Sequence, residues 1–130
     1  MTKDIKQQVV IHAPLAKVFA ALMDEKKHAE FTGAPAAIRS RVGGPFTCYG
    51  KYITGITLEL EPPKRIVQAW RARDWPKGWY SIVTFQLSSA AGGRTKLRFT
   101  QVGVPSNDYR DKNKGWQTHY WEPLKRYLEA

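Results

Sequence analysis

The sequence has little cysteine and no long hydrophobic run. Cys48 is the single cysteine among 130 residues, so the chain cannot form an internal disulfide or a zinc site built from cysteines. No apolar stretch approaches the ~20 residues that a membrane-spanning helix needs. The N-terminus, MTKDIKQQVV, lacks the apolar core of a secretion signal. These absences predict a cytoplasmic protein without a membrane span, and we expect a single domain over residues 1–130.

Motifs for nucleotide, metal and hydrolytic chemistry are also absent. The glycine-rich stretch at residues 43–46 is not followed by Lys-Ser or Lys-Thr, so it predicts a turn and not a phosphate loop. The three histidines, His12, His28 and His119, show no metal-ligand spacing. There is no GxSxG motif. We therefore predict no metal and no cofactor and assign no catalytic residue, although His119 would be the best general acid or base if it faced a cavity.

Acidic residues are few relative to basic ones. The chain has 21 Lys and Arg against 11 Asp and Glu, a formal net charge of +10. The cations are spread from Lys3 to Arg126 with no block longer than two. Nucleic-acid-binding proteins usually concentrate such charge on one face and add a recognition motif, so we expect no nucleic-acid partner.

The hydrophobic pattern predicts a β-α-α-β order that ends in a long helix. Residues 3–12 alternate like a strand, and two short helices are expected over residues 14–23 and from Asp24 to about residue 31. Residues 36–101 alternate with short Gly and Pro turns, which is typical of an antiparallel meander of about six strands. Residues 103–115 are expected to be a polar loop, and a helix follows to residue 128.

Alternation within the meander predicts which side chains face inward. In order along the chain, the expected inner faces carry Tyr52, Thr54, Ile56, Leu58 and Leu60; then Ile66, Gln68 and Trp70; then Val83, Phe85 and Leu87; then Leu97 and Phe99. The last helix has an apolar stripe at spacings of three and four, and Pro123 is expected to kink it. A long meander twists and curls, so this stripe can lie across its concave face and enclose a cavity.

Several segments in sequence order resemble a known family: IHAPLAKVF, FTGAPA, VGGPF, GKYITGITLELEPPKRIVQAWR, WPKGWYSIVTFQL and the final GW…L…YL. They are similar to the domain at the C-terminal end of the activator of Hsp90 ATPase, a member of the SRPBCC or START-like superfamily. The resemblance implies an α+β helix-grip fold. Its parts are a curled antiparallel sheet of about six to seven strands, two short helices after the first strand and a long C-terminal helix across the concave face.

Three hypotheses for function follow. The first is a non-enzymatic protein that holds a small hydrophobic or amphipathic molecule between the sheet and the C-terminal helix. The second, implied by the resemblance, is a stress-response factor that binds a bacterial Hsp90 homologue through its basic face. The third is a polyketide-cyclase-like enzyme that uses His119 or an inner tyrosine. The candidate cavity residues are Phe31, Phe46, Tyr52, Thr54, Ile56, Gln68, Trp70, Phe85, Phe99, Trp116, Tyr120 and Leu124.

A partner surface is expected on the other side of the sheet. Its candidate residues are Arg71, Arg73, Trp75, Trp79, Lys96 and Arg98. The four cations alternate with the inner residues and could form a basic stripe. The sequence leaves open whether the two tryptophans form an exposed contact patch or fold back onto the sheet edge.

Overall fold

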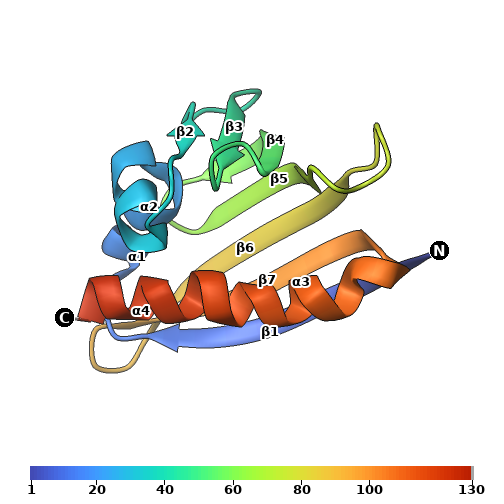
Figure 1. Ribbon diagram of the computed structural model, residues 1–130. Coiled ribbons are helices and arrows are strands. Elements are labelled where there is room, and N and C mark those ends of the chain that lie inside the picture. The colour runs from blue at the N-terminus through green and yellow to red at the C-terminus, as the bar shows by residue number, and fades with distance from the viewer. Residues whose placement is uncertain (130) are drawn as a thin grey trace.

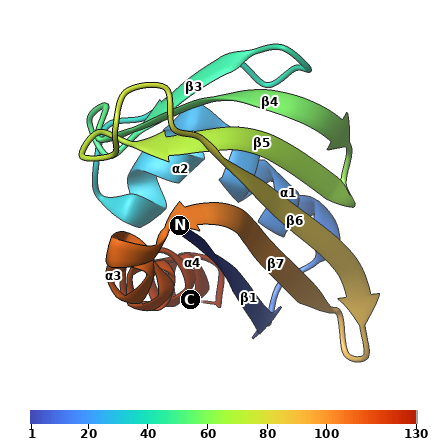
Figure 2. The same ribbon diagram turned by 90° about the vertical axis from the view of Figure 1, so that its right-hand side faces the viewer.

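The computed structural model describes residues 1–129 and has an α+β architecture (Figure 1). The strands form one antiparallel sheet that curls around the C-terminal helix, and two short helices close one end of the molecule (Figures 1 and 2). In chain order the elements are β1 (Thr2–Ile11), α1 (Leu15–Met23), α2 (Glu25–Thr32), β2 (Ala37–Ile38), β3 (Pro45–Cys48), β4 (Ile53–Glu61), β5 (Arg65–Ala72), β6 (Ser81–Ala90), β7 (Arg94–Pro105), the 3₁₀ turn η1 (Ser106–Asp108), α3 (Tyr109–Trp116), the π-helical turn η2 (Gln117–Trp121) and α4 (Glu122–Glu129).

The sheet is a seven-stranded meander in which only the first strand is displaced. The strand order is β1-β7-β6-β5-β4-β3-β2, and every neighbouring pair is antiparallel. Strand β1 therefore lies beside β7, at the opposite edge from β2 (Figure 1). This arrangement confirms the predicted helix-grip fold, including the two short helices and the long terminal helix. No helix among residues 1–129 combines the length and the apolar character needed to cross a membrane.

The boundaries of α2 follow from local chemistry. The carboxylate of Asp24 accepts hydrogen bonds from the backbone N–H groups of Lys26 and Lys27 at 2.9 and 3.0 Å, so it caps the first turn. The helix ends at Gly33, whose φ of 73° lies in the left-handed region that favours glycine. This cap fixes where the helix starts and so positions His28 and Phe31, the two buried residues on its inner side.

The C-terminal helix begins earlier than the sequence pattern indicates. The prediction of a polar loop over residues 103–115 is wrong, because helical structure starts at Ser106 and continues to Glu129. The first turns carry mostly polar residues, so their apolar periodicity is weak. Only Lys112 and Trp116 of α3 are buried, and Asn113 is held by Gln7 of β1, whose Nε2 donates to its backbone oxygen at 2.7 Å. Tertiary contacts therefore stabilise a helix that its own pattern does not predict.

The inner faces of β5, β6 and β7 are as predicted. Strand pairing places the buried residues of neighbouring strands in rows across the concave side, for example Ile66 opposite Phe85 and Phe85 opposite Phe99. The C-terminal helix packs on these rows, with the rings of Phe99 and Trp116 4.3 Å apart between centroids. The core therefore lies between the sheet and this helix.

For β4 the predicted inner face is wrong from Thr54 to Leu58. It is right at Leu60, which follows a register shift between Thr57 and Glu59, pairs with the buried Ile66 and packs against the core. Ile56 and Leu58 are exposed, whereas Ile53 and Thr57 are buried. Both faces of this strand carry apolar residues, so alternation alone favours the face with more of them. The packing selects the other face because Phe46 needs space there: a Cβ on Gly55 would lie 2.6 Å from the Cζ atom of the Phe46 ring.

Candidate functional site: a cavity between the sheet and the C-terminal helix

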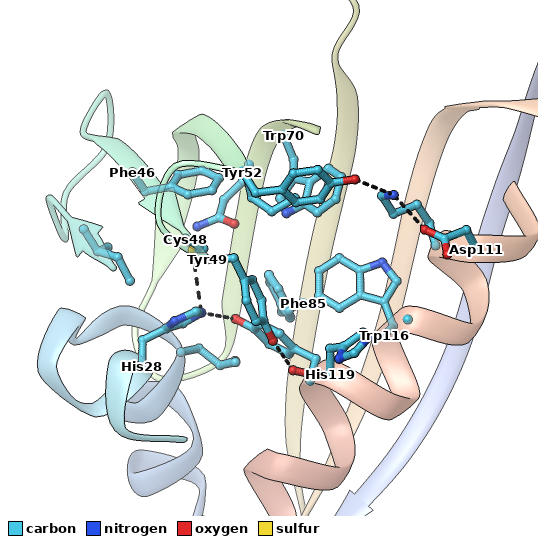
Figure 3. Close-up of a pocket in the computed structure, with 17 residues that line it drawn as sticks. His28, Phe46, Cys48, Tyr49, Tyr52, Trp70, Phe85, Asp111, Trp116 and His119 are labelled. Atoms are coloured by element: carbon cyan, nitrogen blue, oxygen red, sulfur yellow. Dashed lines mark hydrogen bonds and ion pairs between the residues drawn. The ribbon is translucent and has the colours of Figure 1, made fainter. Parts of the chain in front are cut away.

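A cavity of about 330 Å³ lies between the concave face of the sheet and the C-terminal helix (Figure 3). This volume is within the ~300–1,000 Å³ range of small-molecule sites. The sheet and its turns contribute Ile38, Phe46, Cys48, Tyr49, Tyr52, Ile53, Gln68, Trp70 and Phe85 to the lining. The short helices contribute Leu22 and His28, and the C-terminal helix contributes Asp111, Lys112, Gly115, Trp116, His119 and Tyr120.

The structure brings seven of the twelve candidate cavity residues together. These are Phe46, Tyr52, Gln68, Trp70, Phe85, Trp116 and Tyr120. Phe31, Phe99 and Leu124 are buried in the surrounding core and do not line the cavity. Thr54 and Ile56 lie on the outer face of β4 and do not line the cavity.

The main wall of the cavity is aromatic. Trp70 lies between Trp75 and Trp116, with ring centroids 5.4 and 5.6 Å away. The rings of Phe85 and Trp116 also meet edge to face at 6.2 Å. Such geometry is favourable for aromatic pairs and leaves flat apolar surface on the cavity side. The wall therefore suits a flat or narrow hydrocarbon.

The buried end of the cavity holds a small polar cluster. His28 Nε2 lies 2.7 Å from the Tyr120 hydroxyl oxygen and 3.7 Å from Cys48 Sγ. Burial lowers the pKa of His28 to about 4 and raises the pKa of Cys48 to about 12, and it also raises the pKa of Tyr120 well above its ordinary value. All three side chains are therefore uncharged near neutral pH, and Cys48 is a thiol and not a reactive thiolate.

The mouth of the cavity contains an ion-paired lysine. The Lys112 ammonium donates to the Tyr52 hydroxyl at 3.1 Å and lies 3.1 Å from a carboxylate oxygen of Asp111 (Figure 3). A carboxylate oxygen of Asp108 lies 2.8 Å from the same ammonium. Burial alone would lower the pKa of Lys112, but these hydrogen bonds outweigh it and raise the pKa above its ordinary value. Two carboxylates offset one ammonium, so Lys112 does not present a free positive charge to a ligand.

A second bridge joins the turn after β3 to the C-terminal helix. The Tyr49 hydroxyl donates to the backbone carbonyl of His119 (Figure 3). Pro123 lies four residues after His119 and has no N–H to donate to that carbonyl, and the helix has a π-helical turn at this point. Pro123, the proline predicted to kink the helix, therefore leaves the His119 carbonyl without its usual α-helical hydrogen bond. The Tyr49 hydroxyl donates to this same carbonyl.

Gln68 is the polar group in the middle of the wall. Its Nε2 makes only long contacts, 3.5 Å to Thr57 Oγ1 and 3.9 Å to Met23 Sδ. A side-chain amide offers two donors and one acceptor oxygen, so much of this capacity is unused by the described residues. Among residues 1–129 no three His, Cys, Asp or Glu side chains form a group that could hold a metal ion.

Sequence reasoning missed the polar ends of the cavity. It did not select His28, Cys48, Tyr49 or Lys112, which lie outside the meander strands or at their ends. His28 sits in a helix of low apolar content, and Lys112 lies in the stretch expected to be a loop. If the predicted helix is extended toward its N-terminus, spacings of three and four residues put four lining residues on one helical face: Lys112, Gly115, Trp116 and His119.

The tryptophans proposed for a partner surface do not form an exposed patch. Trp75 is buried, and its Nε1 donates to Asp108 at 2.7 Å, while Trp79 Nε1 donates to the Gly103 carbonyl at 2.8 Å. The guanidinium of Arg71 donates to backbone carbonyls of this loop, including that of Trp75 at 3.0 Å. These residues fix the loop against the sheet edge, so of the two arrangements that the sequence left open, Trp75 adopts the one in which the ring folds back onto the sheet edge.

The convex face of the sheet carries an exposed apolar row. Ile56, Ala69, Ile82 and Val102 are successive register partners across β4, β5, β6 and β7. Ile56, Ile82 and Val102 remain 44%, 40% and 50% exposed. We call these four residues the convex row.

The other predicted cations lie near this face. Arg98 is exposed on β7, and Lys96, two residues before it, is half-buried. Arg73 follows β5, with its guanidinium 5.7 Å from the centroid of the Tyr52 ring. Arg98 therefore remains as an exposed cation on β7, four residues before Val102, with no ion pair to any of residues 1–129.

The chain is similar to proteins named as Hsp90 activators. The family model of activator of Hsp90 ATPase homolog 1-like proteins matches residues 12–129. The activator of 90 kDa heat shock protein ATPase homolog 1 of Mus musculus is 33% identical over 96 residues, which are 74% of this chain and 28% of that protein. An uncharacterized protein of Schizosaccharomyces pombe is 32% identical over 124 residues, or 95% of this chain and 37% of that protein. The chain thus spans about a third of the length of these relatives.

Solved structures share the whole fold. An Hsp90 activator from Plasmodium falciparum has a TM-score of 0.90 and 25% identity, and the match covers 97% of this chain and 96% of that one. The Aha1 dimer from Colwellia psychrerythraea has a TM-score of 0.82 at 20% identity, covering 98% and 97% of the two chains, which is a likeness of fold alone.

Proposed function

The chain belongs to the family of activator of Hsp90 ATPase homolog 1-like proteins, and we propose that it binds a small, mainly apolar molecule between its sheet and C-terminal helix. The observation that carries the proposal is the cavity of about 330 Å³, which is walled by aromatic side chains and has polar groups at its two ends. Natural ligand sites combine an apolar wall with a few placed polar groups in this way. In this function the protein binds the molecule and does not change it chemically.

The arrangement of the walls supports this proposal. Side chains from the sheet, from the short helices and from the C-terminal helix surround one space, and the inner face of β4 contributes the glycine that makes room for Phe46. The aromatic wall leaves apolar surface that water can reach through the mouth. A ligand that covers this surface and binds only the folded chain would stabilise the fold.

Native mass spectrometry tests the proposal. The protein is incubated with an organic extract of cells, and its native and denatured masses are compared. In the variant Ile38→Trp the larger side chain occupies the cavity, whereas Ile82→Trp makes the same change on the convex face. We expect an added small-molecule mass on the wild type and on Ile82→Trp that is lost in Ile38→Trp. Equal retention by a folded Ile38→Trp variant, or no added mass on any of them, contradicts the proposal.

A second candidate function is binding to an Hsp90-type chaperone, supported by the names of the relatives and by the convex row. A monomer rarely leaves several large aliphatic side chains exposed together on one sheet face unless they serve an interaction. The exposed cation Arg98 lies on the same strand as Val102, four residues before it, and the chain carries a net charge of +10. The partner surface would thus be apolar with acidic groups at its rim.

This second candidate is tested with a bacterial Hsp90 homologue. Ile82→Ser and Arg98→Glu are expected to weaken binding about tenfold each, and the binding should weaken with added salt. Ile38→Trp is the control because it alters the cavity and leaves the convex row intact. Unchanged affinity of both convex-face variants would exclude this surface. Arg71 is not a suitable probe, since its guanidinium holds the loop after β5.

A further inference from the structure

The buried end of the cavity contains a hydroxyl with unused hydrogen-bonding capacity. Tyr120 is 8% exposed and lines the cavity, and its hydroxyl has one hydrogen-bond partner among the described residues, His28 Nε2 at 2.7 Å. A tyrosine hydroxyl can donate one hydrogen bond and also accept. Whether its proton points to His28 or into the cavity depends on which nitrogen of His28 carries the imidazole proton.

The surroundings of His28 indicate that its proton is on Nε2. The ring is 1% exposed, and Nδ1 is a buried atom without a hydrogen-bond partner among residues 1–129. Burial lowers the pKa of His28 to about 4, so the ring is neutral and carries a single N–H. Orphaned buried N–H groups are rarer than orphaned buried acceptors. The unpartnered Nδ1 is therefore the bare nitrogen, and the N–H is at Nε2.

This tautomer determines that the Tyr120 hydroxyl accepts a hydrogen bond from His28 and can donate one elsewhere. Nε2–H donates to the Tyr120 oxygen at 2.7 Å, and the hydroxyl then has its own proton free. A hydroxyl that already accepts a hydrogen bond also becomes a better donor, because the two bonds polarise each other. The buried end therefore offers a donor to whatever occupies the cavity.

The charges around the cavity select a neutral acceptor over an anion. Close to Tyr120 the groups are uncharged, since burial keeps Cys48 as a thiol and His28 as a neutral ring. The lysine at the mouth is paired with Asp108 and Asp111. A carboxylate at the buried end would lose its hydration without gaining a cation, which is strongly unfavourable.

Resting on the proposed function, we infer that the ligand carries a neutral carbonyl oxygen on a flat hydrocarbon body, and that this oxygen accepts a hydrogen bond from the Tyr120 hydroxyl. His28 orients the hydroxyl and does not touch the ligand. The aromatic wall of Trp70, Phe85 and Trp116 contacts the hydrocarbon body. The ligand class is thus a small aromatic or conjugated ketone, aldehyde or ester.

Competition between matched probes tests this inference. The fluorescent naphthyl ketone prodan serves as the reporter, because its emission shifts when its carbonyl accepts a hydrogen bond. Methyl naphthyl ketone, ethylnaphthalene and naphthoate compete with it; they share a ring system and differ in the oxygen. We expect the ketone to bind about tenfold more tightly than the hydrocarbon, which corresponds to one net hydrogen bond, and the carboxylate to bind most weakly.

Two variants assign the preference to Tyr120. Tyr120→Phe removes only the hydroxyl and should abolish the preference for the ketone while ethylnaphthalene still binds. Tyr80→Phe makes the same change on an exposed residue and should retain the preference. If Tyr120→Phe keeps the preference, or if naphthoate binds best, the inference is overturned although the cavity still binds ligands. If none of the probes binds, the proposed function itself fails.

Nitrogen-15 NMR tests the tautomer independently of any ligand. We expect His28 to show a protonated Nε2 and a bare Nδ1 in the free protein near neutral pH. A proton on Nδ1 would make Tyr120 the donor to His28, and the hydroxyl would then offer only an acceptor to the cavity. That result overturns the assignment of a carbonyl ligand even if the probes bind.

Discussion

The indole N–H of Trp116 donates to the side-chain oxygen of Gln101 at 2.7 Å, and Gln101 donates in turn to Ser81 at 3.0 Å. The Ser81 hydroxyl completes the series by donating to the Trp70 carbonyl at 2.9 Å. All of these side chains are buried. The C-terminal helix is thus joined to β7, β6 and β5 by one continuous series of buried hydrogen bonds, which holds one wall of the cavity in place.

Replacing Gln101 by leucine should destabilise the protein by about 1–3 kcal/mol, because the indole N–H of Trp116 would be left buried without an acceptor. Urea denaturation measures the change in unfolding free energy. Gln8→Leu is the matched control, since Gln8 is exposed on β1. A loss no greater than that of the control would mean that water or another group serves the indole.

A methyl group at Gly55 should be costly, whereas one at Gly115 should not. A Cβ on Gly55 would lie 2.0 Å from the Ala69 carbonyl oxygen and 2.6 Å from the Phe46 ring, while at Gly115 the nearest atom is 3.8 Å away, in His119. Gly55→Ala should therefore lose at least about 1–3 kcal/mol. Gly115→Ala should be neutral or slightly stabilising, because alanine favours a helix. Thermal denaturation compares the two, and equal Tm values would refute the close packing at Gly55.

His28 should make the protein less stable in mild acid. Its pKa is lowered to about 4 in the folded state from about 6.5 in the unfolded chain, so the unfolded state binds the extra proton between these values. The contribution of His28 to stability is complete above about pH 6.5, declines as the pH falls and reaches a loss of about 3 kcal/mol near pH 4.

The same measurement on His28→Gln isolates this effect from other groups. Tyr120 and Cys48, which face the imidazole, stay uncharged throughout this range because their pKa values are raised. The wild type should therefore lose more unfolding free energy than the variant between pH 7 and about pH 4. Parallel pH profiles for the two proteins would contradict a neutral buried His28.

Removing the Tyr49 hydroxyl should loosen the cavity where the turn after β3 meets the C-terminal helix. Tyr49→Phe breaks the bond to the His119 carbonyl and keeps the ring, so we expect a stability loss of about 1 kcal/mol or less. The larger effect should be on hydrogen exchange, which should quicken at the backbone amides of residues 49–52 and around residue 119. Tyr80→Phe on the exposed surface is the control. Unchanged exchange at both places would show that this bridge does not hold the turn and the helix together.

Much of the fold is readable from the sequence because its determinants are local or periodic. Asp24 marks the start of α2 through its own capping bonds, and alternation along β5, β6 and β7 identifies their buried faces. The stripe containing Trp116 and Tyr120 identifies the helix that the sheet surrounds. Five cavity residues follow from these patterns alone: Gln68, Trp70, Phe85, Trp116 and Tyr120.

Tertiary structure decided the rest, because those outcomes depend on contacts between distant segments. The inner face of β4 was set by the fit of the Phe46 ring over Gly55, and the early start of the C-terminal helix by contacts such as that between Gln7 and Asn113. The polar ends of the cavity arise where the short helices and the turn at residues 49–52 approach the C-terminal helix. The sequence by itself determined that a helix lies within a curled sheet. Only packing decided that the space between them is open, and that an uncharged hydroxyl and imidazole close its inner end.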